Sequence, residues 1–421
     1  MQTWLLKKGS EKKFRSGHPW VFSNELAQSP KGIVPGELIE LRDFQGNFLA
    51  RGYGHPNSLI SFRTLARNSD SRVDVEFFRD RLLQASRLRK LSGVFEWSHR
   101  LCFAEGDYIP GLVIDRFRLE NDGQVFVLQS STAGMDRLLP SVLESLELLV
   151  EAESGDWTKT SIVVANDSKS RAMEGIAVEA KRVHRAGEGF DPVRAKLIAE
   201  PSLPGLKPVT FEADLIGGQK TGFFLDQRFN IQLTSKSLAN LARERKDIRI
   251  LDLCCYIGQW GSHLSNVVTS LGGRAEVVCV DASVKALELA ARNVEAHGGV
   301  AKTVKADVLE AMDQFDKKSF DVVICDPPAF IKKKKDLPTG SQAYYKLNRE
   351  AIRKTTSGGL FVSCSCSGLF TEEDFRSMLA RVSASTGETR WIARGGHSPD
   401  HPQRPEFPQG TYLKGWIGVV S

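Results

Sequence analysis

The chain has 421 residues and a net charge of +6, with 41% hydrophobic and 26% charged residues, which is the composition of a globular protein rather than a disordered or fibrous one. No stretch approaches the ~18 consecutive apolar residues of a membrane span, and the start of the chain is unlike a signal peptide, so we expect a cytoplasmic protein without membrane partners. Seven cysteines without paired spacing argue against both a disulfide framework and a structural zinc site.

The positive charge is concentrated at the N-terminal end. Residues 1–100 contain 17 Lys and Arg against 10 Asp and Glu, whereas the rest of the chain contains 40 against 41. A basic module on a neutral body indicates a polyanionic partner, and nucleic acid is the first candidate. A solvated basic surface without a partner is the alternative.

The first half of the chain predicts two small domains. Residues 1–70 are typical of short strands broken by turns such as Pro35-Gly36, which suits a small β-barrel. From Arg72 to about Leu91, apolar residues recur among Arg and Asp residues in the pattern of an amphipathic helix. Residues 71–195 then predict a small α/β unit, with strands at 112–114, 125–128 and 162–164 and a helix over 135–150.

The second half predicts a doubly wound parallel sheet. After a linker-like stretch between Pro201 and Pro208, strands alternate with helices, which is the rhythm of parallel α/β folds. The predicted strands cover 248–253, 276–280, 303–305, 320–324 and 360–363. Three helices are predicted: one that follows the first strand and ends near residue 269, one over 284–297 and one over 341–355.

A glycine turn follows the first of these strands. Asp252 ends the strand, and Tyr256 and Gly258 lead into a helix. Glycine at such a turn lets the backbone approach a ligand, but this chain has neither a Walker sequence nor a complete GxGxxG, so the turn alone is a weak signal. Asp281 ends the second strand, where a carboxylate can accept both hydroxyls of a ribose.

Two further acids extend the series. Asp307 and Val308 follow the third strand and could hold an adenine, and Asp326-Pro327 follows the fourth. Each acid alone could be a turn residue. Four acids at the ends of consecutive parallel strands predict one ligand crevice. The ordered set resembles class I S-adenosylmethionine-dependent methyltransferases.

Two cysteines, Cys364 and Cys366, follow the fifth strand. They could be buried structural thiols or include a nucleophile; no His or Cys cluster completes a metal site. Asp-Pro-Pro is found in methyltransferases that act on nucleobases. Carbon 5 of a pyrimidine must first be activated by a thiolate at carbon 6, whereas an exocyclic amine needs no such help. A cysteine close to Asp326 in the sheet therefore favours a carbon-5 pyrimidine methyltransferase.

Over essentially its whole length the chain resembles the ribosomal RNA large-subunit methyltransferase I family. This resemblance implies an N-terminal PUA domain over 1–70, a middle α/β domain over 71–195 and a Rossmann-like methyltransferase domain over 196–421. Ile257 and Gln259 depart from the Thr and Gly usual in the family. The matching segments are Gly17–Ser23, Glu105–Asp115, Lys220–Arg228, Asp326–Phe330, Ser365–Gly368 and the stretch from His401 to Gly415.

The resemblance also assigns roles. It makes Cys366 the nucleophile, while Asp326, from its strand-end position, is expected to hold the edge of the cytosine. It implies S-adenosylmethionine as cofactor, no metal, large-subunit ribosomal RNA as partner, and it allows a homodimer. The predicted cofactor-binding residues are Asp226, Gln227, Asp252, Tyr256, Gly258, Asp281, Ala282, Asp307, Val308, Asp326 and Pro327.

The predicted reaction is methylation of carbon 5 of a cytosine in large-subunit ribosomal RNA through a covalent cysteine–RNA adduct. Two alternatives stay open at this point. An RNA guanine or adenine N-methyltransferase would not need the cysteines. A non-catalytic RNA-binding assembly factor could keep the fold without binding the cofactor, although the complete set of strand-end acids argues against it.

Overall fold

The computed structural model describes residues 1–153 and 155–421. The chain forms two compact units. The first consists of Met1–Ala195, Asp214–Phe224 and Pro399–Gly410, and the second of Lys196–Ala213, Leu225–Ser398 and Thr411–Ser421. The division into three domains at residues 70 and 195 stays a prediction.

The N-terminal part of the first unit is a five-stranded sheet in the order β1-β3-β4-β5-β2, as expected for a small β domain. Side chains alternate between inside and outside along β3, where Ile39 and Leu41 are fully buried. They pack with Trp4, Phe14 and Phe62 in one core. The elements are β1 (Gln2–Leu5), α1 (Glu11–Arg15), β2 (Trp20–Phe22), β3 (Leu38–Arg42), β4 (Phe48–Gly54) and β5 (Ile60–Ala66).

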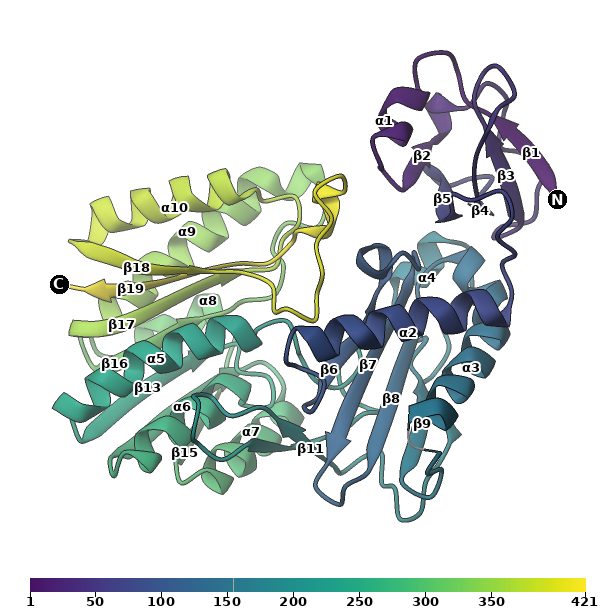
Figure 1. The fold of residues 1–421 in the computed structure, drawn as a ribbon. Coiled ribbons are helices and arrows are strands. Elements are labelled where there is room, and N and C mark those ends of the chain that lie inside the picture. Colours follow the sequence, from purple (N-terminus) through teal and green to yellow (C-terminus); the bar gives the residue numbers. More distant parts are fainter. Residues whose placement is uncertain (154) are drawn as a thin grey trace. The chain divides into compact units, whose positions relative to one another are not determined.

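The rest of the first unit is an α/β layer. Two helices, α2 (Val75–Leu91) and α3 (Ala133–Glu153), pack side by side against its sheet, so both helices predicted here are confirmed (Figure 1). Asp74 caps α2 by accepting a hydrogen bond from the Phe77 backbone N–H at 3.0 Å. The other elements are β6 (His99–Phe103), β7 (Leu112–Leu119), β8 (Gln124–Ser130), β9 (Thr160–Val164), α4 (Ser170–Met173) and β10 (Arg182–Arg185).

Two later segments of the chain belong to this first unit. Thr221 donates a hydrogen bond to the Asp115 carboxylate at 2.6 Å. The buried guanidinium of Arg89 donates to the Asp400 carbonyl at 2.8 Å. Polar contacts between residues far apart in the sequence therefore place these segments in the unit.

The second unit contains a seven-stranded sheet in the order β15-β14-β13-β16-β17-β19-β18. The first five strands in this order are parallel. Only β19 is reversed in this sheet, because it is antiparallel to both of its neighbours, β17 and β18, so β18 runs in the direction of the first five strands. The chain moves outward from β13 to β14 and β15 and then returns to β16 on the other side of β13, which creates the switch point where such sheets bind ligands. The strands are β13 (Asp247–Leu253), β14 (Arg274–Asp281), β15 (Val300–Lys305), β16 (Phe320–Cys325), β17 (Thr355–Ser365), β18 (Thr389–Gly395) and β19 (Lys414–Val420).

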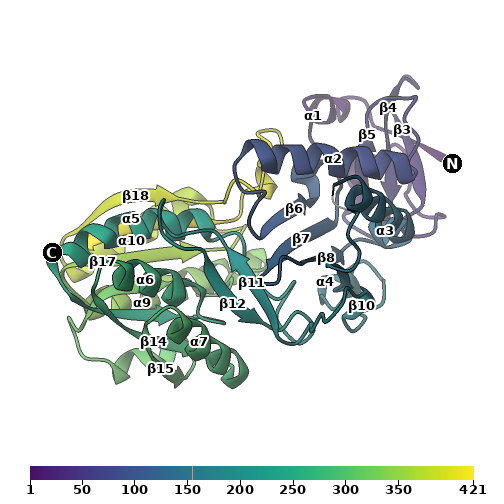
Figure 2. The ribbon, with the colours of Figure 1, turned by 60° about the horizontal axis from the view of Figure 1, so that its bottom comes forward.

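Helices cover both faces of this sheet (Figures 1 and 2). One hydrophobic core lies under α5, α6 and α7, and the other lies under α8, α9 and α10. This unit is therefore the doubly wound α/β sheet that the sequence predicts. The helices are α5 (Arg228–Glu244), α6 (Gln259–Ser270), α7 (Val284–Ala296), α8 (Val308–Ala311), α9 (Leu337–Lys354) and α10 (Glu372–Thr386). Two further strands, β11 (Ala195–Ala199) and β12 (Val209–Ala213), pair with each other and are not part of this sheet.

In the part of the chain that the structure describes, no helix is long and apolar enough to cross a membrane.

Candidate cofactor and catalytic site

The turn between β13 and α6 has an unusual backbone. Cys254, Tyr256 and Gly258 all have positive φ, at 63°, 50° and 77°. An L-residue in this conformation costs roughly 1–2 kcal/mol, and such strain is found preferentially at ligand sites. A Cβ atom at Gly258 would lie 3.0 Å from both Cα and the carbonyl oxygen of Ala290. The conformation therefore favours glycine here, and the close approach of Ala290 leaves little space for any side chain.

Asp281 holds this turn from the neighbouring strand. Its Oδ2 accepts the Tyr256 backbone N–H at 3.0 Å, and its Oδ1 accepts the Ser283 N–H at 2.9 Å. Each carboxylate oxygen keeps a second lone pair. The half-exposed Asp281 and the exposed Ala282 next to it thus lie at the edge where a ribose is expected.

Asp252 lies beneath the turn rather than at its surface. It is fully buried, and its Oδ2 accepts the Gly261 N–H at 3.1 Å. Burial raises the pKa of Asp252 to about 7. Among the residues that the structure describes, Oδ1 is buried without a hydrogen-bond partner. An orphaned acceptor at this place fits a donor from a bound group, such as the ammonium at the methionine end of S-adenosylmethionine.

Asp307 and Val308 follow β15 at the same edge of the sheet. Asp307 is exposed and caps α8, because its Oδ1 accepts the Leu309 N–H at 2.9 Å. Val308 is 7% exposed and belongs to the core on that face. The adenine role that the sequence assigns to this pair stays a prediction.

Asp326 receives two hydrogen bonds from side chains. Gln227 Nε2 donates to Oδ1 at 2.8 Å, and the indole Nε1 of Trp260 donates to Oδ2 at 3.1 Å. The Gln227 amide is oriented in turn, because its Oε1 accepts from Asn230 at 2.6 Å. Asn230 accepts the backbone N–H of Gly396 at 2.8 Å. The carboxylate therefore has a fixed orientation at the end of β16.

The two candidate cysteines have different environments. Cys366 is half-buried, and its Sγ lies 3.8 Å from the carbonyl oxygen of Pro327. Cys364 is fully buried, and its Sγ lies 3.9 Å from Gln227 Oε1. Burial raises the pKa of the Cys364 thiol well above its usual value, which disfavours a thiolate there. Cys366 is thus the better placed of the two to react with a ligand.

Asp226 lies just before α5. Its Oδ2 accepts the hydroxyl of Tyr412 at 2.7 Å, and its backbone carbonyl accepts from Ser398 at 3.0 Å. Tyr412 lies in the family-like stretch from His401 to Gly415, but nothing in the sequence assigns it to the site. Sequence patterns also do not reveal Trp260 and Asn230, since nothing in their spacing relates them to Asp326.

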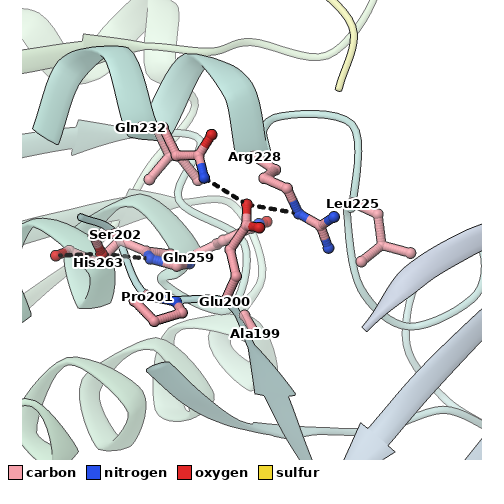
Figure 3. A pocket seen from close by; sticks show the side chains of 10 residues that line it. Ala199, Glu200, Pro201, Ser202, Leu225, Arg228, Gln232, Gln259 and His263 are labelled. Atoms are coloured by element: carbon pink, nitrogen blue, oxygen red, sulfur yellow. Dashed lines mark hydrogen bonds and ion pairs between the residues drawn. The ribbon is translucent and has the colours of Figure 1, made fainter. Parts of the chain in front are cut away.

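The first turn of α5 is anchored by a buried polar group that Figure 3 shows in a small pocket. Glu200 accepts from Arg228 Nε and from Gln232 Nε2, each at 2.9 Å. Nearby, Ser202 and His263 share a hydrogen bond of 2.7 Å, and burial lowers the pKa of His263 to about 3, so this ring is neutral. The contacts to Arg228 fix the start of α5, which Asp226 and Gln227 directly precede.

The structure thus brings the predicted acids Asp281, Asp307 and Asp326 to one edge of the sheet, with Asp252 below the turn. No group of three or more His, Cys, Asp or Glu side chains within residues 1–153 and 155–421 could hold a metal ion.

Comparisons with known proteins agree with this architecture. Residues 5–67 match the PUA-like domain family, and residues 219–386 match the methyltransferase small domain family. Two solved structures cover 100% of this chain and are themselves covered to 100%. One, described as a SAM-dependent methyltransferase from Streptococcus mutans, has a TM-score of 0.72 at 16% identity. The other, described as a methyltransferase complexed with SAH, has a TM-score of 0.73 at 17% identity.

The parallel sheet with its strand-end acids defines a class I methyltransferase, the class that uses S-adenosylmethionine. Curated relatives named ribosomal RNA large subunit methyltransferase I are 32% identical in Cronobacter sakazakii, over 98% of both chains. In Photobacterium profundum and Tolumonas auensis the identity is 33%, over 99% of this chain and 98% of each relative. The chain belongs to the ribosomal RNA large subunit methyltransferase I family.

Substitution of Gly258 tests the turn. Gly258→Ala should weaken binding of S-adenosylmethionine at least about tenfold, because a Cβ atom must displace the α7 backbone and distort the turn. Titration calorimetry with the cofactor measures this effect. The matched control is Gly272→Ala after α6, where φ is 74° and nothing lies within 4 Å of the added atom. Equal losses of affinity in both variants would contradict the role of the turn.

The raised pKa of Asp252 predicts that the stability of the folded protein depends on pH. This pKa is raised in the folded state, so the native protein retains a proton that the unfolded chain loses between about pH 4 and 7. Stability from this group is therefore present at low pH and is lost as pH rises through about 7. Relative to Asp252→Asn, the wild-type protein should lose roughly 2–3 kcal/mol between pH 5 and pH 8. Calorimetric melting of both proteins without cofactor measures the difference, and a constant difference across this range would refute the prediction.

Proposed function

We propose that this protein transfers a methyl group from S-adenosylmethionine to carbon 5 of a cytosine in large-subunit ribosomal RNA, with Cys366 as nucleophile. The observation that carries the proposal is the position of Cys366, whose half-buried thiol lies 3.8 Å from the Pro327 carbonyl beside Asp326. The names of the relatives support ribosomal RNA as the substrate.

The cofactor residues keep the roles that the sequence suggests. S-adenosylmethionine supplies an electrophilic methyl group on a sulfonium. Asp281 and Ala282 would hold its ribose end, and Asp307 and Val308 its adenine. The turn at Tyr256 and Gly258, with Asp252 below it, would hold the methionine end, and Asp226, Gln227 and Pro327 would close the site.

The thiol makes carbon 5 reactive. Addition of the Cys366 thiolate to carbon 6 forms a C–S bond and shifts the ring electrons so that carbon 5 becomes an enamine-type nucleophile. Asp326 supports a proton on the ring nitrogen as this charge develops. As the methyl group bonds to carbon 5, its bond to the sulfonium sulfur breaks and S-adenosylhomocysteine is left. Loss of the carbon-5 proton to a base, cleavage of the C–S bond and release of the proton from the ring nitrogen then restore the aromatic ring and the thiolate. Gln227 and Trp260 keep Asp326 oriented throughout.

Two basic regions would bind the RNA backbone. The PUA-like domain lies within the basic N-terminal quarter of the chain. Lys332–Lys335 follow Asp326 by a few residues, and all four are exposed. Lysine contacts to phosphates release counterions, so binding should weaken with salt. A cytoplasmic location and a homodimer remain predictions.

Cysteine substitutions test the nucleophile. Cys366→Ser should lower methylation of large-subunit ribosomal RNA by at least about 1,000-fold, because the serine hydroxyl is a far weaker nucleophile. Cys364→Ser should stay within about tenfold of the wild-type rate, since that thiol is buried against Gln227. Transfer of a radioactive methyl group measures both, and RNA carrying 5-fluorocytosine should trap the wild-type enzyme covalently. Activity that survives loss of both thiols would favour the N-methyltransferase, and failure to bind S-adenosylmethionine would favour the assembly factor.

Lysine substitutions test the RNA path. Lys333→Ala with Lys334→Ala should weaken RNA binding and reduce the salt slope by about 2, if each side chain contacts one phosphate. Lys317→Ala with Lys318→Ala removes the same charge from two exposed lysines that precede β16, at the opposite edge of the sheet. Filter binding at several salt concentrations measures the slopes. Identical slopes for the two double variants would exclude the Lys332–Lys335 contact.

A further inference from the structure

Lys414 is a buried lysine at the end of the sheet where Cys366 lies. It is the first residue of β19, pairs with Ser365 of β17 and is 4% exposed. Its ammonium donates hydrogen bonds to the backbone carbonyls of Ser367 at 2.7 Å and Tyr412 at 2.8 Å. A protonated ammonium has three hydrogens, so these two bonds do not exhaust it.

Burying this ammonium is unfavourable unless a negative charge compensates it. Burial lowers the pKa of Lys414 to about 8, while Cys366, Glu372 and Asp374 act in the opposite direction, with Cys366 the strongest of the three. The nearby Tyr344 hydroxyl bonds Ser367 Oγ at 2.9 Å, and burial raises the pKa of Tyr344 to about 12, so it is uncharged near neutral pH.

The two carboxylates near Lys414 are engaged elsewhere. Glu372 accepts the Trp416 indole N–H at 2.9 Å and pairs with Arg394 at 3.0 Å. Asp374 forms the capping box of α10 with Thr371, in which each side chain bonds the other residue's backbone N–H. A thiolate at Cys366 is therefore the anion that most directly complements the Lys414 ammonium.

We propose that Lys414 is a positioning residue that stabilises the thiolate of Cys366 and so sets the pH range in which this cysteine can attack a base. The inference rests on the proposed function for its catalytic meaning, but the thiolate itself can be measured without RNA. A nearby cation in a site shielded from water favours the charged form of a thiol. Because Lys414 loses its own proton above about pH 8, the ion pair has its greatest effect around neutral pH.

Alkylation of the holo protein tests the proposal directly. Iodoacetamide reacts with thiolates, and mass spectrometry of peptides reports the rate at each cysteine between about pH 6 and pH 9. Lys414→Met should move the rise of Cys366 reactivity upward by about one pH unit and slow it about tenfold at pH 7. Lys414→Arg, which keeps the charge, should stay within about threefold of the wild-type rate.

An unchanged Cys366 profile in Lys414→Met would overturn the proposal and leave Lys414 as a backbone clamp. If that variant does not fold, the same coupling is measured from the lysine side by NMR of ε-13C lysine. Cys366→Ser should lower the titration midpoint of Lys414, because it removes the compensating anion, and an unchanged midpoint would refute the pair. Retention of methylation by Cys366→Ser would instead refute the proposed function, whatever the alkylation profile shows.

Discussion

The carboxylate of Asp326 lies between the amide of Gln227 and the indole of Trp260, and these two hydrogen bonds join the segments that build the site. Gln227 immediately precedes α5, Trp260 lies in the first turn of α6, and Asp326 ends β16. Apolar packing alone does not fix the direction of a polar side chain, whereas these two hydrogen bonds do. Two neutral donors orient the carboxylate and do not cancel its charge.

Burial separates residues that the sequence presents as equivalents. Cys364 and Cys366 lie two residues apart, yet one thiol contacts Gln227 in the interior and the other remains accessible beside Pro327. Among the strand-end acids, Asp252 is fully buried while Asp307 is exposed. Desolvation disfavours the charged form of a thiol or carboxyl. Residues of the same type therefore differ in pKa and reactivity when they are buried to different extents.

Periodicity predicted helices such as α2 and α7 to within a few residues. The prediction did not include α5, whose buried face mixes apolar residues with Asn230, Thr234 and Ser235. The ordered acids predicted the edge of the sheet that forms the site because parallel strands end together. The hydrogen-bond partners of the acids were not predictable from the sequence. Trp260 is 66 residues from Asp326 and Tyr412 is 186 residues from Asp226, and only folding brings each pair together.

The base and atom that receive the methyl group test the central claim most directly. Large-subunit ribosomal RNA from cells with and without the gene can be digested to nucleosides and analysed by mass spectrometry. The proposed attack of Cys366 on carbon 6 requires that one 5-methylcytidine is present with the gene and absent without it. Loss of an N-methylated purine instead, with 5-methylcytidine unchanged, would contradict the assignment of Cys366 as a nucleophile.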